Sequence, residues 1–351
     1  MRDINSRKPS RLPLILLSVI SLLLCLALIY TVVDFQSYKS STQETIAVFE
    51  QNEEELVQTT IPVETFQQYA DQFGVSVEFI QQFFPDKIVY KDAGGTVYAD
   101  IDENLPKHNY DWSNLVSVNG RYEYQENGVS TAAVGIDVSK HQGEIDWKRV
   151  KAAGIDFAII RMGNRGYGTG KLVVDETFKE NARGALDAGL DIGVYFFSQA
   201  INVEEALEEA NLLLDAIQEF DITYPVVFDT EAVADSSGRV NNLPQEELTN
   251  IAIAFCDTVK DAGYRPMIYA NVKWFVTKLD LNRLGEYDKW VAQYFRKPYF
   301  PYEFQMWQYS GSGKVDGIEG DVDLNLCFAD YTKKSDGQAG TNDAASGEAS
   351  N

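Results

Sequence analysis

From Ala133 onward, short apolar segments of strand length alternate with segments whose apolar side chains recur at helical spacing. The helical segment at residues 202–220, for example, gathers its apolar side chains on one face. Gly154, Gly189 and Gly263 end three of the helical segments, and glycine is the usual residue just past a helix end. This repeated alternation predicts βα architecture, with strands at residues 133–139, 157–163, 191–198, 224–231 and 265–270.

The alternation changes after about residue 288, where the helical pattern stops and three short strand segments follow. These segments start near residues 289, 304 and 321, which brings the predicted strands to eight. Eight strands within about 200 residues fit a barrel whose late helices are abbreviated. We therefore predict an α/β fold, a modified (β/α) barrel over residues 131–332. A chain of 351 residues, 45% of them apolar, is long enough to bury such a core and to carry further segments.

One of those further segments is an uncharged apolar run at residues 13–33, long enough to cross a bilayer as a helix. Four basic residues lie within residues 1–12, and a basic flank of this kind stays in the cytoplasm. We therefore expect a single-pass anchor in the cell membrane, with a cytoplasmic N-terminus and an extracellular barrel. The alternative is a cleaved signal peptide, but no small-x-small site closes the run. Cys25 lies within the run and is interpreted as a membrane-embedded thiol.

Two segments separate the predicted anchor from the barrel. Residues 34–62 are polar and acidic with apolar side chains at helical spacing, which fits a stalk helix. Residues 63–130 indicate a small α+β module, with two short helices, the second capped by Ser76, and a hairpin that turns at Gly94-Gly95. A protein partner could bind through residues 34–130.

Composition limits the function classes. The formal net charge of −23 argues against a nucleic-acid partner, whose phosphates would be repelled. Three cysteines and two histidines are too few for a disulfide framework or a typical zinc site, so we expect no metal and no cofactor. Residues 333–351 are rich in Gly, Ser, Ala and Asp, which indicates a disordered tail.

The predicted strand at residues 224–231 ends in two carboxylates, Asp229 and Glu231. Side chains two apart on a strand point to the same face, with their Cα atoms roughly 6 to 7 Å apart. Like charges this close cannot both ionise freely, so one group keeps its proton near neutral pH. A protonated acid beside an ionised carboxylate is the usual equipment for cleaving a glycosidic bond. The alternative is an N-cap acid followed by a loop acid, with no catalytic role.

Other predicted strands also carry polar residues near the ends where barrels place their active groups. The first strand carries Asp137, and the last carries Asp321 and Asp323. Burying an unpaired charge costs several kcal/mol, so acids on three strands of one barrel favour a shared acidic site over separate structural roles. Further polar and aromatic candidates on the strands between them are Tyr195, Tyr269, Trp290 and Gln308.

A series of motifs follows in order along residues 133–328. They are Gly-Ile-Asp-Val-Ser-Lys-His-Gln-Gly at 135–143, Ile-Asp-Trp at 145–147, Phe-Ala-Ile-Ile-Arg at 157–161, Ala-Gly-Leu-Asp-Ile-Gly-Val-Tyr-Phe-Phe-Ser-Gln-Ala at 188–200, Pro-Val-Val-Phe-Asp-Thr-Glu at 225–231, Trp-Gln-Tyr at 307–309 and Val-Asp-Leu-Asn at 322–325. In order and spacing they resemble glycoside hydrolase family 25, the Chalaropsis-type lysozymes or N-acetylmuramidases. The resemblance covers somewhat over half of the chain and does not reach residues 34–130.

The resemblance implies a modified (β/α) barrel that hydrolyses the β-1,4 bond between N-acetylmuramic acid and N-acetylglucosamine in peptidoglycan. By motif position, Glu231 would be the general acid that protonates the leaving oxygen. Asp229 would support the developing positive charge, either directly or by orienting the acetamido group of the substrate as nucleophile. Asp137 and Asp323 would complete an acidic floor.

The resemblance also implies sugar subsites, for which we expect Tyr195, Tyr269, Trp290 and Gln308. Arg161 is interpreted either as a charge partner of this site or as one half of a structural salt bridge. Taken together, we expect a membrane-anchored muramidase that remodels the cell wall at the outer face of the membrane. The alternative is a non-catalytic wall-binding or accessory module of an envelope assembly, such as a secretion or conjugation machine.

Overall fold

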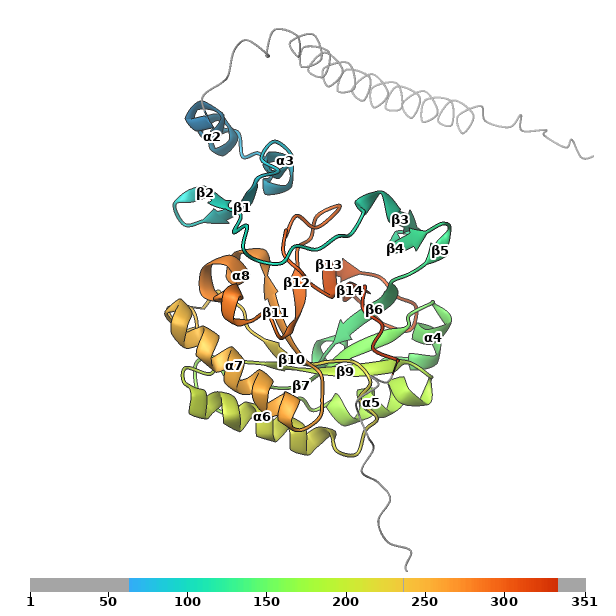
Figure 1. Ribbon diagram of the computed structural model, residues 1–351. Helices are drawn as coiled ribbons and strands as arrows, with labels where there is room; N and C mark the ends of the chain where they lie inside the picture. The colour runs from blue at the N-terminus through green and yellow to red at the C-terminus, as the bar shows by residue number, and fades with distance from the viewer. Residues whose placement is uncertain (1–62, 236, 334–351) are drawn as a thin grey trace, which may run out of the picture. The chain divides into compact units, whose positions relative to one another are not determined.

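A computed structural model describes residues 63–235 and 237–333 (Figure 1). The predicted cytoplasmic segment, membrane anchor and stalk helix, up to residue 62, lie outside the described residues, as does the predicted tail from residue 334. Within the described part of the chain, no helix combines the length and the apolar character that crossing a membrane requires.

The chain divides into two compact units, one ending at Phe73 and the other beginning at Gly74. Of the first unit, the structure describes helix α2 (Val63–Gln72) and the residue after it. The second unit contains all the other described elements.

The second unit is built around eight strands that close into a barrel (Figure 1). All eight were predicted, and the barrel is confirmed. Seven of them run parallel, and the last runs antiparallel to both of its neighbours, the first strand and the seventh. The strands are β6 (Ala133–Val138), β7 (Phe157–Arg165), β9 (Asp191–Phe197), β10 (Val226–Asp229), β11 (Pro266–Asn271), β12 (Asp288–Ala292), β13 (Met306–Gly313) and β14 (Val322–Cys327). A short strand, β8 (Leu172–Val174), pairs with β7 outside the barrel.

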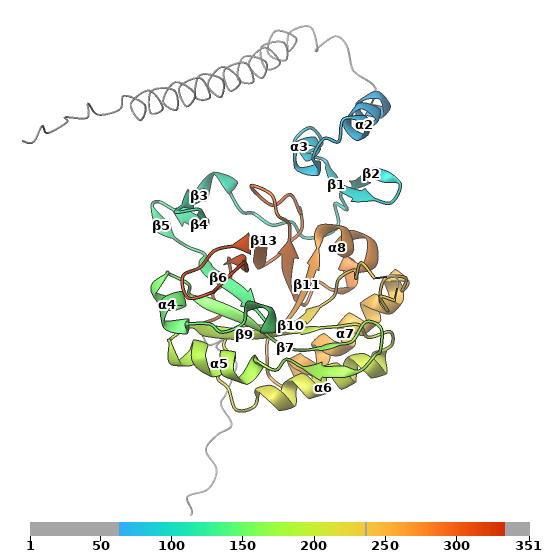
Figure 2. The ribbon, with the colours of Figure 1, turned by 180° about the vertical axis from the view of Figure 1, so that it is seen from behind.

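Helices cover the outside of the first strands. They are α4 (Trp147–Ala152), α5 (Phe178–Asp187), α6 (Val203–Ile217), α7 (Gln245–Asp261) and α8 (Val272–Lys278), and α6 and α7 lie side by side (Figure 2). After α8 the described chain contains only a short 3-10 helix, η3 (Leu281–Arg283), as the predicted loss of late helices requires.

Helix α6 shows how the sequence forms these elements. Its N-cap Asn202 accepts a hydrogen bond from the backbone N–H of Glu205, and acidic residues occupy the first turn. Ala206, Ala210 and Leu213 recur at helical spacing and are buried against the barrel.

Side chains of alternate strand residues fill the barrel interior. Phe157 and Ile159 point inward, while Ala158 and Ile160, which alternate with them, belong to the layer under the helices. Gly135 fits this packing because the ring of Phe157 lies where a side chain would begin, 2.1 Å from an ideal Cβ position. These apolar side chains fill one end of the barrel interior. Polar side chains occupy the other end, where the parallel strands finish.

The sequence indicated a small α+β module at residues 63–130; of these, residues 74–130 lie in the same compact unit as the barrel. Ser76 caps helix α3 (Val77–Gln81) as expected, through a hydrogen bond of 3.2 Å from the N–H of Phe79. The expected hairpin is present as β1 (Lys87–Asp92) and β2 (Gly95–Asp100). A second small sheet follows, made of β3 (Leu115–Val118), β4 (Arg121–Glu126) and β5 (Val129–Ser130).

The segment between these two sheets packs on the barrel through aromatic side chains. Tyr110 donates a hydrogen bond to the backbone oxygen of Phe304 at 2.6 Å, and its ring stacks on that of Phe328 with centroids 4.3 Å apart. Trp112 meets Trp307 edge-on. These contacts fix the second small sheet beside the barrel.

Candidate active site

A cavity of about 80 Å³ lies at the end of the barrel where the parallel strands finish. It is lined by Asp137, Tyr195, Asp229, Glu231, Tyr269, Trp290, Gln308 and Asp323. The structure therefore brings together eight of the nine candidate residues that the sequence suggested. The ninth, Arg161, does not line the cavity.

The direction of β14 explains how Asp323 reaches this cavity. Because β14 runs opposite to the other strands, its beginning lies at the end where they finish, and Asp323 faces Asp137 across the β14–β6 pair. Asp321, one residue before β14, instead forms an exposed ion pair with Lys314 at 2.9 Å. The carboxylates of Asp137 and Asp323 thus lie in the same cavity as those of Asp229 and Glu231.

Asp229 and Glu231 share the cavity although strand β10 is shorter than predicted. The strand ends at Asp229 and not at residue 231, yet the backbone N–H of Thr230 still bonds to the oxygen of Tyr269 at 3.1 Å. The hydroxyl of Thr230 points away from the cavity and accepts a hydrogen bond from Trp274. The alternation of side chains therefore continues past the strand, and the two carboxylates lie on the same side.

A network of amide and hydroxyl groups holds Asp137. Its Oδ2 atom accepts hydrogen bonds from Gln308 Nε2 at 2.9 Å and from Asn325 Nδ2 at 2.8 Å. The oxygen of the Gln308 amide is fixed as well, because Gln308 Oε1 accepts hydrogen bonds from the hydroxyls of Tyr269 and Tyr294, both at 2.8 Å. These two hydroxyls orient the amide so that its N–H group points toward the carboxylate.

Trp290 supports one of the two amide groups that bind Asp137. Only 2% of its surface is exposed, so its ring has little face to offer to a sugar. Its Nε1 donates to Asn325 Oδ1 at 2.9 Å, and its ring packs edge-on against Tyr269. In this structure Trp290 positions the amide that holds Asp137.

Sequence reasoning missed Asn325 and Tyr294. Asn325 lies two residues after Asp323 on the same strand, so the period of two could have placed both on one face. Tyr294 follows β12 in a loop, where no periodicity applies. It is 57% exposed and offers an aromatic face next to the cavity.

Burial and neighbouring carboxyl groups together raise the pKa of three carboxyl groups of the cavity. Burial raises the pKa of Asp229 well above its usual range, and the charges of Glu231 and Asp137 raise it further. Burial, with the charge of Asp323, does the same for Asp137. Burial and then Asp323 raise the pKa of Glu231 to about 7. The site therefore retains protons at neutral pH, as acid catalysis requires.

Asp229 has a further property. The residue is 4% exposed, and among the described residues its Oδ1 atom has no hydrogen-bond partner. A buried carboxyl oxygen without a donor costs free energy, so the arrangement is completed by a proton or by a donor on a bound molecule.

Arg161 forms a salt bridge, and its charge also lowers the pKa of Asp229 in the cavity, so the structure fits both interpretations that the sequence left open. Its Nη2 lies 2.7 Å from Asp175 Oδ2, and the side chain of Asp175 is fully buried. Asp175 also accepts hydrogen bonds from the backbone N–H groups of Lys140 and Thr177. Through Asp175, Arg161 thereby fixes the loop that follows β6. Strand β6 is the one that carries Asp137.

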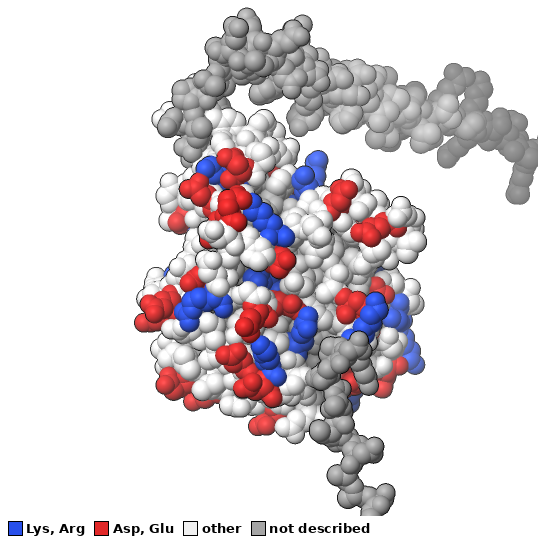
Figure 3. Space-filling model, viewed as in Figure 1, with Lys and Arg blue, Asp and Glu red and all other residues white. Residues whose placement is uncertain are grey.

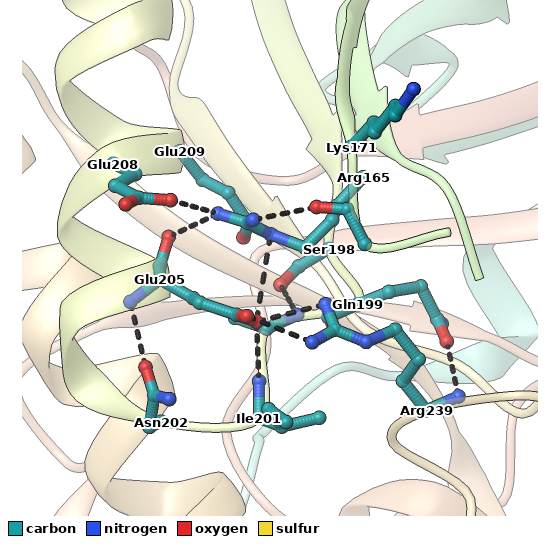
Figure 4. Close-up of polar contacts among 12 residues, drawn as sticks. Arg165, Lys171, Ser198, Gln199, Ile201, Asn202, Glu205, Glu208, Glu209 and Arg239 are labelled. Atoms are coloured by element: carbon teal, nitrogen blue, oxygen red, sulfur yellow. Dashed lines mark hydrogen bonds and ion pairs between the residues drawn. The ribbon is translucent and has the colours of Figure 1, made fainter. Parts of the chain in front are cut away.

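A network of ion pairs fixes the loop that follows Glu231 (Figure 4). Arg239, in this loop, binds Glu205 of α6 through both terminal nitrogens, at 2.9 and 2.8 Å. Arg165 of β7 binds Glu209 of the same helix at 2.7 Å, with both side chains almost fully buried. The backbone N–H of Arg239 also donates to Gln199. The loop is thus attached to the barrel wall at several points.

Among the described residues, no cluster of three or more His, Cys, Asp or Glu side chains is arranged to hold a metal ion. The chemistry that the cavity offers is that of carboxyl groups whose pKa values are raised. A family model described as glycosyl hydrolases family 25 matches residues 136–318.

Similar proteins include two curated relatives and one solved structure. The uncharacterized protein YegX of Escherichia coli K12 is 32% identical over 201 residues, which cover 55% of this chain and 68% of YegX. Lysozyme M1 of Streptomyces globisporus is 30% identical over 201 residues, 54% of this chain and 66% of that lysozyme. The modular autolysin LytC of Streptococcus pneumoniae superposes with a TM-score of 0.50 at 25% identity, over 69% of this chain and 56% of LytC.

Replacing Glu231 by glutamine should reduce the loss of stability as the pH rises from about 4.5 to about 7. The folded protein raises the pKa of this carboxyl from 4.5 to about 7. Below about pH 4.5 the group is protonated in both states; as the pH rises further, the unfolded chain loses its proton first, so stability falls until about pH 7 and stays lower above it. We expect the Tm of Glu231→Gln at about pH 8 to exceed that of the wild type by several degrees, at about 2–4 °C per kcal/mol.

Thermal unfolding followed by circular dichroism at about pH 4, 6 and 8 measures this difference. Glu180→Gln, on the exposed surface of α5, is the matched control and should follow the wild type. A Tm difference for Glu231→Gln that is the same at all three pH values would show that this carboxyl is not proton-linked to folding.

Proposed function

Because this chain belongs to glycosyl hydrolases family 25 and is a glycoside hydrolase of the lysozyme type, we propose that it cleaves the β-1,4 bond between N-acetylmuramic acid and N-acetylglucosamine. The observation that carries the proposal is the convergence of Asp137, Asp229, Glu231 and Asp323 on one cavity. Binding alone would not need acids there, since amides would accept and donate hydrogen bonds to a glycan at a lower cost of burial. The cost of burying them is consistent with catalysis.

Glu231 is the proposed general acid. Unlike Asp229, it remains partly exposed, so a substrate can reach it, and its pKa of about 7 keeps about half of it protonated at neutral pH and most of it protonated below. A general acid is most effective when its pKa lies near the working pH. Proton transfer from Glu231 to the glycosidic oxygen would leave a carboxylate that could then activate water.

The proposed role of Asp229 is to stabilise the positive charge that develops on the sugar during bond cleavage. In its ionised form, Asp229 could stabilise the sugar cation directly through the unpartnered Oδ1 atom, or accept the N–H of the substrate's acetamido group and so orient that group as nucleophile. Asp137 is held by two amides and contributes its charge to the pKa of Asp229. Asp323, more exposed than Asp137, raises the pKa of Glu231.

We further propose that the enzyme acts on peptidoglycan outside the cell while anchored in the membrane by residues 13–33. The apolar run and the basic residues before it support this placement. The anchor also addresses a physical problem, because a chain of net charge −23 is not attracted to an anionic wall. Tethering would hold the barrel near its substrate at a high effective concentration.

Activity is tested with purified full-length protein in detergent, incubated with purified peptidoglycan. The wild type should release fragments with new reducing ends on N-acetylmuramic acid. Glu231→Gln should lower the rate by about 10²–10⁴-fold, because a glutamine cannot donate the proton. Glu180→Gln should keep the wild-type rate. Reducing-end analysis by mass spectrometry measures both, and equal rates for wild type and Glu231→Gln would remove Glu231 from the chemistry.

Placement is tested by fractionation and by protease treatment of cells. We expect the full-length protein in the membrane fraction, resistant to high salt, and a variant lacking residues 2–33 in the soluble fraction. Protease added to cells with the wall removed should digest the barrel and leave a short membrane stub. A wild-type protein in the soluble fraction, or a barrel that protease cannot reach until cells are lysed, would contradict the proposed anchor or its orientation.

A further inference from the structure

A second hollow, of about 630 Å³, lies between the β3–β4 sheet and the barrel. One wall carries Ser117, Asn119 and Arg121, which precede the residues matched by the family model. The other wall carries Tyr294 and Arg296 from the loop after β12, with Lys314 from the loop after β13. This hollow, here called the side groove, is thus built jointly by the barrel and by a part of the chain that the family match does not include.

The side groove lies next to the catalytic cavity. Tyr294 lines the groove, and its hydroxyl binds Gln308, which in turn holds Asp137. Leu324 also lines the groove, while its neighbour Asp323 lines the cavity. At Gly311 a Cβ atom would lie 3.3 Å from Asp323 Oδ1 and 3.5 Å from the Tyr294 hydroxyl, so both side chains lie close to Gly311. A molecule bound in the cavity can therefore extend past Tyr294 into the groove.

The two hollows differ in charge. The cavity contains four carboxyl groups and no cation, whereas the groove is lined by Arg121, Arg296 and Lys314 against a single acid, Glu78. Over the face of the molecule seen in Figure 3, acidic and basic side chains are interspersed. The chain as a whole has a net charge of −23, whereas the groove is lined by three cations and one acid, so its local charge is positive.

The three cations are not equally engaged. Arg121 donates to the backbone oxygen of Ala153 at 2.5 Å, and Lys314 pairs with Asp321. Arg296 is exposed, and its backbone N–H donates to Glu78 Oε1 at 2.8 Å. No ion pair forms at its guanidinium among the described residues, so this group can receive an anion.

These features select one part of the proposed substrate. In a bare glycan the only anionic group is the lactyl carboxylate of N-acetylmuramic acid, which is attached directly to the sugar ring. The peptides attached to N-acetylmuramic acid carry free carboxylates and a polar backbone, which suit guanidinium, hydroxyl and amide groups. We propose that the side groove binds the peptide stem of peptidoglycan through Arg296, so that the enzyme prefers peptide-bearing glycan; this inference rests on the proposed function.

The test compares two substrates made from one preparation: uncrosslinked glycan strands that keep their peptides, and the same strands after an amidase has removed the peptides. For each substrate, kcat/KM of the full-length protein is measured from the reducing ends released. We expect the wild type to prefer peptide-bearing strands, mainly through a lower KM. Arg296→Glu should lower the ratio of the two kcat/KM values about tenfold, which corresponds to about 1.4 kcal/mol.

Lys297→Glu is the matched control, because it reverses a neighbouring exposed charge that does not line the groove. Its ratio should stay close to that of the wild type. The wild-type preference should also weaken between about 0.05 and 0.5 M salt, as charge interactions become screened.

An unchanged ratio in Arg296→Glu, or an equal fall in Lys297→Glu, would overturn the assignment of the groove while leaving the proposed function in place. A wild type with no activity on either substrate would overturn the proposed function itself, and this inference with it.

Discussion

Burial of four carboxyl groups in one small cavity is the constraint on which the rest of the structure depends. Ionised carboxylates lose hydration on burial and repel one another, so the cavity is stable only where protons are retained or where donors replace water. The protein does both. Gln308 and Asn325 donate to Asp137, whereas burial and neighbouring charge raise the pKa of Glu231 to about 7.

The barrel supplies the rigidity that this arrangement needs. The donors to Asp137 come from β13 and β14, and each amide is fixed by an aromatic side chain from another strand or the loop after it. Ion pairs through Arg161 and Arg239 hold the loops that follow β6 and β10. Acid–base catalysis requires such positioning, because small displacements of the reacting groups lower the rate steeply. The side groove adds a wall from outside the family match.

Much of this could be predicted from the sequence, because the strands are strongly apolar and their carboxylates are spaced by the period of a strand. The eight strands and the meeting of Asp229 with Glu231 follow from local pattern alone. The direction of β14, which brings Asp323 to Asp137, depends on its neighbours in the barrel. The bond between Tyr294 and Gln308 and the ion pair between Arg239 and Glu205 join residues distant in sequence or in irregular loops, where no periodicity applies.

The central claim is that the cavity keeps Glu231 protonated near neutral pH. The most direct measurement is a pH titration of the side-chain carboxyl resonances by carbon-13 NMR in protein labelled at Asp and Glu, with Glu231→Gln to assign the signal. The account predicts that the Glu231 carboxyl titrates at about pH 7, and that the value falls in Asp323→Asn, because the charge of Asp323 helps to raise it. Titration near the ordinary value of 4.5, unaffected by Asp323→Asn, would contradict the account.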